Sequence, residues 1–189
     1  MRLSRPPPSY GVAMLATHPL HVREEDFLAR PPSAEREELL DGQIVVSPSG
    51  TWRHQEVLRR LLWVLQAWCD RHPPHHPALA PLDVRFGPGR ILQPDAMVLA
   101  SAPPLDAPTP LTVVPRLCVE VLSSDVDRDR HTRRLVYADA GVPEYWVVDP
   151  LGSLEVFTGP RLGTCLAGQG VVASPTLHGL VVDVTALTR

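Results

Sequence analysis

The sequence contains no lysine, because all 18 of its basic residues are arginine. Mechanisms that need a lysine amine, either as a general base or as a Schiff-base nucleophile, are therefore excluded. Acidic residues number 21, and the formal net charge of −3 gives no overall attraction for nucleic acid. Any contact with a phosphate backbone must come from a local group of arginines.

Cysteine and long apolar runs are also scarce. The three cysteines, Cys69, Cys118 and Cys165, lie far apart and form no CxxC pair, so neither a disulfide framework nor a zinc knuckle is indicated. No stretch approaches the roughly 18 apolar residues that a membrane span needs. We therefore expect a protein of the reducing cytoplasm that makes no membrane contact.

Proline is abundant, with 22 residues that cluster in expected loops and near the N-terminus. A hydrophobic content of 44% in 189 residues is enough for the core of a single domain. We expect residues 1–18 to form a disordered tail and residues 19–189 to form the domain. Because the first segment has the composition of a tail, Met14 is an alternative start of the chain.

Hydrophobic periodicity predicts the main elements of an α/β fold. In residues 53–72 apolar side chains recur at three- and four-residue spacing, which indicates a helix that ends before Pro73 and Pro74. Further helices are expected at 24–29, 35–40 and 127–140. Strands are expected at 43–47, 82–86, 91–99, 116–122, 144–148, 154–157 and 180–184.

Two acidic residues in expected strands are the first candidates for a functional site. Asp95 follows a proline within 91–99, and Glu120 interrupts the nearly continuous apolar run of 116–122. Neighbouring strands lie about 4.8 Å apart, so the two carboxylates are able to share one metal ion. Alternatively, Asp95 caps a turn and Glu120 pairs with an arginine, and spacing alone leaves both interpretations open.

The order of several short motifs resembles the Uma-type restriction endonuclease family of bacteria, which belongs to the PD-(D/E)XK nuclease superfamily. The resemblance covers about Val22 to Phe157. Its motifs are LDGQIVV from Leu40, SPS from Ser47, RHQ from Arg53, LDVR from Leu82, QPD from Gln93, VEVLS from Val119, and the segment 137–149.

This resemblance implies a restriction-endonuclease-like fold, in which a mixed β-sheet is flanked by α-helices. It implies Mg²⁺ as the cofactor, with Mn²⁺ as a substitute, and Asp95 and Glu120 as the metal ligands. DNA is the implied substrate. Nucleases of this fold often dimerise, so a homodimer is also expected.

Two positions depart from the pattern of the family. Gln43 stands where the family usually has a glutamate, so one expected carboxylate of the active site is a neutral amide here. Arg133 stands where the family places its lysine, four residues before Tyr137. An arginine can stabilise negative charge on a phosphate, but its pKa is too high for it to act as a base.

His54 is a secondary candidate near the start of the first long helix. An imidazole titrates near neutrality, so this side chain could orient a water molecule or contact a phosphate. A histidine at the start of a helix is also commonly structural.

These observations favour a metal-dependent DNA endonuclease in which Asp95 and Glu120 bind the metal and Arg133 stabilises developing charge. A second hypothesis follows from Gln43 and Arg133. It is a catalytically degenerate nuclease-fold module that binds nucleic acid or protein. A third is a structural oligomer with no role in nucleic-acid binding.

Overall fold

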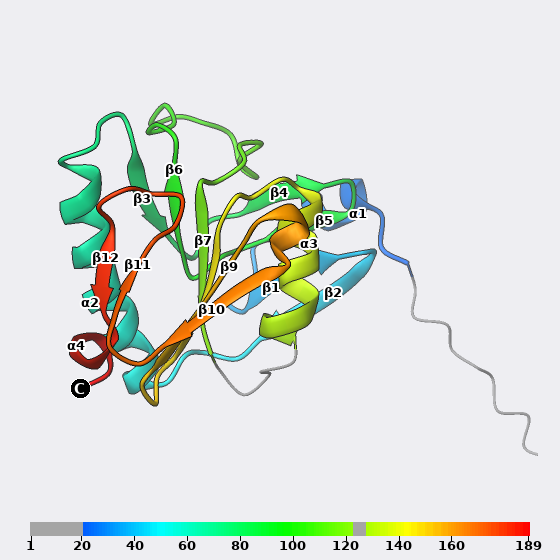
Figure 1. Cartoon of the computed structure of the whole chain (residues 1–189). Coiled ribbons are helices and arrows are strands. Elements are labelled where there is room, and N and C mark those ends of the chain that lie inside the picture. The colour runs from blue at the N-terminus through cyan, green and yellow to red at the C-terminus, as the bar shows by residue number, and fades with distance from the viewer. Residues whose placement is uncertain (1–20, 123–127) are drawn as a thin grey trace, which may run out of the picture.

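The computed structural model describes residues 21–122 and 128–189 of the chain (Figure 1). The tail predicted at residues 1–18 and the alternative start at Met14 lie outside the described residues. In the described part, three sheets of six, four and two strands and a long helix pack around two hydrophobic clusters.

A six-stranded mixed sheet forms the centre of the fold. Its strand order is β10-β9-β8-β7-β6-β3, and β7 and β8 are the pair that runs parallel. The sheet confirms the predicted restriction-endonuclease-like architecture. The strands are β3 (His76–Leu79), β6 (Ala96–Leu99), β7 (Leu117–Val121), β8 (Tyr145–Asp149), β9 (Ser153–Thr158) and β10 (Thr164–Gly168).

Helix α2 (Trp52–Cys69) covers one face of this sheet. The side chain of Thr51 caps its first turn by accepting a hydrogen bond from the His54 amide at 3.2 Å. Its apolar stripe, which includes Leu61 and Leu65, packs on alternate residues of β6 and β7, as the periodicity predicts. No helix in the described ranges has the length and apolar content required to cross a membrane.

A second, four-stranded antiparallel sheet and helix α3 lie over the opposite face (Figure 1). Its order is β2-β1-β5-β4. The elements are α1 (Glu24–Leu28), β1 (Arg36–Leu40), β2 (Gln43–Ser47), β4 (Val84–Gly87), β5 (Arg90–Leu92), the π-helical segment η1 (Arg128–Arg133) and α3 (Arg134–Asp139). Segments η1 and α3 correspond to the helix predicted at 127–140, whose first residue is not described.

The C-terminal region adds three small elements and one short helix. The strands β11 (Val171–Ala173) and β12 (Val181–Asp183) form a two-stranded sheet, which replaces part of the strand predicted at 180–184. A 3₁₀ turn, η2 (Pro160–Leu162), precedes β10, and α4 (Val184–Thr188) ends the chain. Leu180 and Val184 join the cluster beneath α2.

The helix predicted at residues 35–40 is wrong, because this segment forms strand β1. Strand β1 pairs with β2 through a two-residue turn at Asp41 and Gly42, where Leu40 faces Gln43 across the hairpin. Both turn residues have a positive φ, of 48° and 81°, as a type I′ turn requires. An Asp-Gly pair between two short apolar segments is a strong hairpin signal, and it outweighs the helical propensity of the glutamates.

The single strand predicted at 91–99 is also wrong. The segment divides at Gln93 to Asp95 into β5, which belongs to the four-stranded sheet, and β6, which belongs to the six-stranded sheet. Pro94 has no amide donor, so a continuous ladder is interrupted at this point. As a result, Asp95 lies in the connection between the two sheets.

Candidate active site

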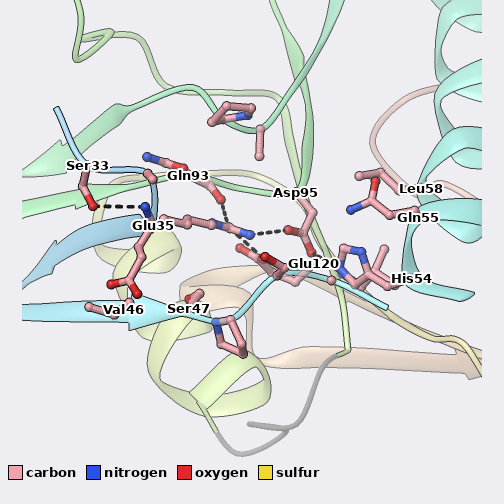
Figure 2. Close-up of a pocket in the computed structure, with 18 of the residues that line it drawn as sticks. Ser33, Glu35, Val46, Ser47, His54, Gln55, Leu58, Gln93, Asp95 and Glu120 are labelled. Carbon is pink, nitrogen blue, oxygen red and sulfur yellow. Dashed lines mark hydrogen bonds and ion pairs between the residues drawn. The ribbon is translucent and has the colours of Figure 1, made fainter. Parts of the chain in front are cut away.

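Asp95 and Glu120 are brought together by the pairing of β6 and β7. In this antiparallel pair Ala96 faces Val119, so extending the register by one residue places Asp95 opposite Glu120 with both side chains on one face. Both are nearly fully buried. Figure 2 shows them facing each other near His54 in the wall of a cavity of about 850 Å³.

Three groups hold the carboxylate of Asp95. The guanidinium of Arg36, at the start of β1, donates from Nη1 to Oδ1 at 2.6 Å. The Val121 amide donates to Oδ2 at 2.9 Å, and His54 Nε2 lies 3.2 Å from the same oxygen. Burial acts to raise the pKa of Asp95, but the His54 hydrogen bond, the nearby positive charges and the Val121 amide outweigh it and lower this pKa to about 2.

The lowered pKa of Asp95 predicts a loss of stability in acid. A carboxyl whose pKa is depressed on folding stabilises the native state above its unfolded pKa of 3.8, and this contribution disappears as the pH falls towards 2. We expect about 2 kcal/mol from this residue. Urea unfolding of the wild type and Asp95→Asn from pH 6 to pH 2 measures it. Parallel pH profiles for the two proteins would contradict the expectation.

Glu120 is held from the opposite side by Tyr137 and Arg133. The Tyr137 hydroxyl donates to Glu120 Oε1 at 2.6 Å, and Arg133 Nη1 donates to the same oxygen at 3.1 Å. Burial and the Glu120 charge together raise the pKa of Tyr137 well above its usual value, so the phenol stays protonated as a donor. Tyr137 and Arg133, which are four residues apart, thus reach the same carboxylate oxygen.

A third carboxylate, Glu38 of β1, belongs to the site and was not among the predicted residues. It is buried and makes a bidentate pair with Arg133, with contacts of 3.1 Å to Nη1 and 2.5 Å to Nη2. It also accepts a hydrogen bond from the backbone N–H of Gln93 at 2.7 Å. The sequence signal that could have found it is the Asp-Gly turn, because in the hairpin strand that this turn predicts Glu38 shares a face with the apolar Leu40.

Gln43 lies outside this arrangement. It is the first residue of β2, its side chain is exposed, and it is not among the residues that line the cavity. The amide at position 43 therefore removes no charge from the site, which contains the three carboxylates Glu38, Asp95 and Glu120. The second hypothesis, a degenerate nuclease, loses one of its two supports.

Arg133 is buried between two of these carboxylates. Burial acts to lower its pKa, but Glu120, Tyr137 and Glu38 together raise the value well above that of a free arginine. The side chain is consequently a permanent cation whose described contacts hold Glu38 and Glu120 in place. That Arg133 also stabilises negative charge on a phosphate group stays a prediction.

His54 contacts Asp95 from the first turn of α2. An ionised carboxylate can only accept a hydrogen bond, so in this 3.2 Å contact His54 Nε2 carries a proton and donates it to Asp95 Oδ2. Its Nδ1 atom is buried with no hydrogen-bond partner in the described part of the chain, and a Cβ added at Gly50 would lie 2.8 Å from it. The geometry supports a positioning role on Asp95.

The oxygen atoms of the site belong to the chemical types that bind hard divalent cations. Among the described residues, no group of three or more His, Cys, Asp or Glu side chains is arranged to hold a metal ion. However, Asp95 Oδ1, Glu120 Oε2 and the Gln93 carbonyl all face one cationic group, the guanidinium of Arg36. Carboxylate and carbonyl oxygens are the ligands that Mg²⁺ prefers, and this guanidinium stands in for a cation.

A solved structure supports the fold. The chain is similar to the crystal structure of a protein from Anabaena variabilis described as a putative nuclease belonging to DUF820. Their TM-score is 0.73 at 18% sequence identity, and the match covers 88% of this chain and 97% of the other. At this level of identity the similarity shows the fold, which is restriction-endonuclease-like.

A family model identifies the chain more closely. Residues 24–185 match the model of Uma2, described as "Putative restriction endonuclease". The chain belongs to the Uma2 family, as the motifs predicted, and this membership supports a nuclease. No curated protein matches the sequence.

Proposed function

We propose that this protein is a metal-dependent DNA endonuclease that hydrolyses phosphodiester bonds. The observation that supports the proposal most directly is the convergence of Asp95, Glu120 and the Gln93 carbonyl on one cationic point in a cavity wall. Buried carboxylates are costly unless a cation or hydrogen-bond donors compensate their charge. The family membership supports the same class of reaction.

Asp95 and Glu120 would hold Mg²⁺, or Mn²⁺ in its place, together with the Gln93 carbonyl. The bound ion would lower the pKa of a water molecule and neutralise charge on the phosphate. Different residues hold the two carboxylates in place. Val121 and His54 fix Asp95, whereas Arg133 and Tyr137 fix Glu120.

The remaining residues of the site contribute orientation and charge. Arg133 cannot accept a proton, because its pKa is raised well above that of a free arginine. Its ion pairs with Glu38 and Glu120 make it a positioning residue for these two carboxylates. Arg36 lines the cavity and is partly exposed, so it is the arginine that can meet a phosphate group.

A cleavage assay tests this proposal. We expect purified protein to nick or linearise supercoiled DNA in millimolar Mg²⁺ or Mn²⁺, and EDTA to abolish the reaction. Linear duplex, single-stranded DNA and RNA should be compared in the same assay. Absence of cleavage on every substrate by a protein that binds Mn²⁺ would contradict the endonuclease and favour a nuclease-fold module that binds nucleic acid or protein without cutting it.

A further inference from the structure

Arg36 occupies the point at which the oxygen atoms of the site meet. Its Nη1 donates to Asp95 Oδ1 at 2.6 Å, and its Nη2 donates to the Gln93 carbonyl. The same Nη2 lies 3.6 Å from Glu38 Oε1 and 4.0 Å from Glu120 Oε2. One guanidinium thus faces every acidic residue of the site and the carbonyl between them.

The two arginines of the site are not equivalent. Arg133 is buried, with 3% of its side chain exposed, and both of its Nη atoms donate to carboxylates. Arg36 is 23% exposed at the cavity wall, and one of its two Nη atoms donates to a backbone carbonyl instead of a carboxylate. Arg36 is therefore the less completely bound of the two and has an open route into the cavity.

A divalent cation and the Arg36 guanidinium would compete for the same oxygens. Three carboxylates face two guanidinium groups, which leaves a single negative charge in the site. Adding a divalent ion while Arg36 stays in place would bring like charges together in a poorly solvated region. With Arg36 moved away, the three negative charges of the carboxylates balance the single charge of Arg133 and the two charges of the metal ion.

We propose that Arg36 is a resident cation that holds the metal position in the metal-free protein and must leave it before a divalent ion can bind. This inference rests on the proposed function, because it concerns the same ligands. The guanidinium moves into the cavity, where a phosphate group of the substrate offers it an anionic partner. Metal affinity of the free protein is low as a consequence.

Mn²⁺ binding followed by electron paramagnetic resonance or calorimetry tests the proposal without any cleavage. We expect Arg36→Gln to lower the Kd for Mn²⁺ about 10- to 100-fold, the range that corresponds to losing a charge-assisted hydrogen-bond competitor. Arg130→Gln is the matched control. It removes the same charge from a partly exposed ion pair with Glu155, so its Kd should stay near that of the wild type.

Two further variants keep the test independent of folding and of other ion sites. Arg36→Lys keeps a positive charge but loses the planar fork, so it should bind Mn²⁺ more tightly than the wild type by a smaller factor. If Arg36→Gln is poorly folded without metal, Mn²⁺ should raise its melting temperature more than that of the wild type. Adding Asp95→Asn to Arg36→Gln should abolish the gain in affinity.

The outcomes separate the two proposals. Equal Kd values for the wild type and both Arg36 variants would overturn the resident-cation proposal and leave the metal site intact. Tight binding that survives Asp95→Asn would place the ion elsewhere and would also overturn it. No Mn²⁺ binding by any of these proteins at millimolar concentration would overturn both the resident cation and the metal-dependent function.

Discussion

Replacing Asp95 with asparagine is expected to reduce DNA cleavage about a thousandfold or more, with the fold retained. The amide keeps the shape of the side chain but removes the negative charge at the point where Arg36, His54 and the Val121 amide converge. The substitution therefore removes both a proposed metal ligand and the negative charge that these three groups contact. Single-turnover cleavage of supercoiled DNA at saturating Mn²⁺ measures the change.

The matched control is Asp106→Asn, which makes the same chemical change at an exposed residue of a loop. Its cleavage rate should equal that of the wild type. Cleavage by Asp95→Asn at an undiminished rate would show that the activity belongs to a contaminant or to another site. Circular dichroism of the variant should match the wild type, so that a loss of rate reports on the chemistry.

Arg133→Met is expected to produce the largest loss of stability, about 3–5 kcal/mol in the free energy of unfolding. The substitution keeps much of the buried volume but removes the guanidinium from Glu38 and Glu120, which would remain as buried carboxylates. Urea unfolding at neutral pH measures the difference. Adding Glu38→Gln to the variant should recover part of the loss, because the two residues act as a pair.

Arg130→Met provides the comparison within the same π-helical segment. Arg130 pairs with Glu155 at 2.9 Å, and both side chains are partly exposed, at 31% and 25%. Surface pairs of this kind contribute less than about 1 kcal/mol. Equal losses for Arg130→Met and Arg133→Met would contradict the assignment of Arg133 as the buried link between carboxylates.

Local sequence signals were sufficient for some elements. The periodic apolar positions of α2 predicted both the helix and the face that it buries, and Pro73 and Pro74 predicted its end. An acidic residue inside an apolar strand marked Glu120. Its partner Asp95 was also found, although in a connection between sheets instead of within a strand. The family motifs predicted the mixed sheet.

Other features depend on contacts between distant segments, which local patterns do not contain. Glu38 and Arg133 are 95 residues apart and meet only when β1 and η1 pack over the central sheet. Arg36 reaches Asp95 across a separation of 59 residues. The prediction that Gln43 belongs to the site was wrong for the same reason. The geometry of the β1–β2 hairpin leaves Gln43 exposed and buries Glu38 in the site instead.

The alternation of side chains in β1 and β2 therefore changes the functional interpretation. With Gln43 exposed and Glu38 buried, the site has three carboxylates and two arginines in a chain without lysine. Arg133 replaces the charge of a lysine but not its proton chemistry. A homodimer and a cytoplasmic location stay predictions from the sequence.

The most direct test of this account is the location of a bound metal ion. An anomalous difference map from a crystal of the wild-type protein soaked in Mn²⁺ should show one peak within coordination distance of both Asp95 and Glu120. The Arg36 guanidinium should then lie in the cavity, away from Asp95. A peak at other residues, or Asp95 and Glu120 still bridged by Arg36 at saturating Mn²⁺, would contradict the proposed metal centre.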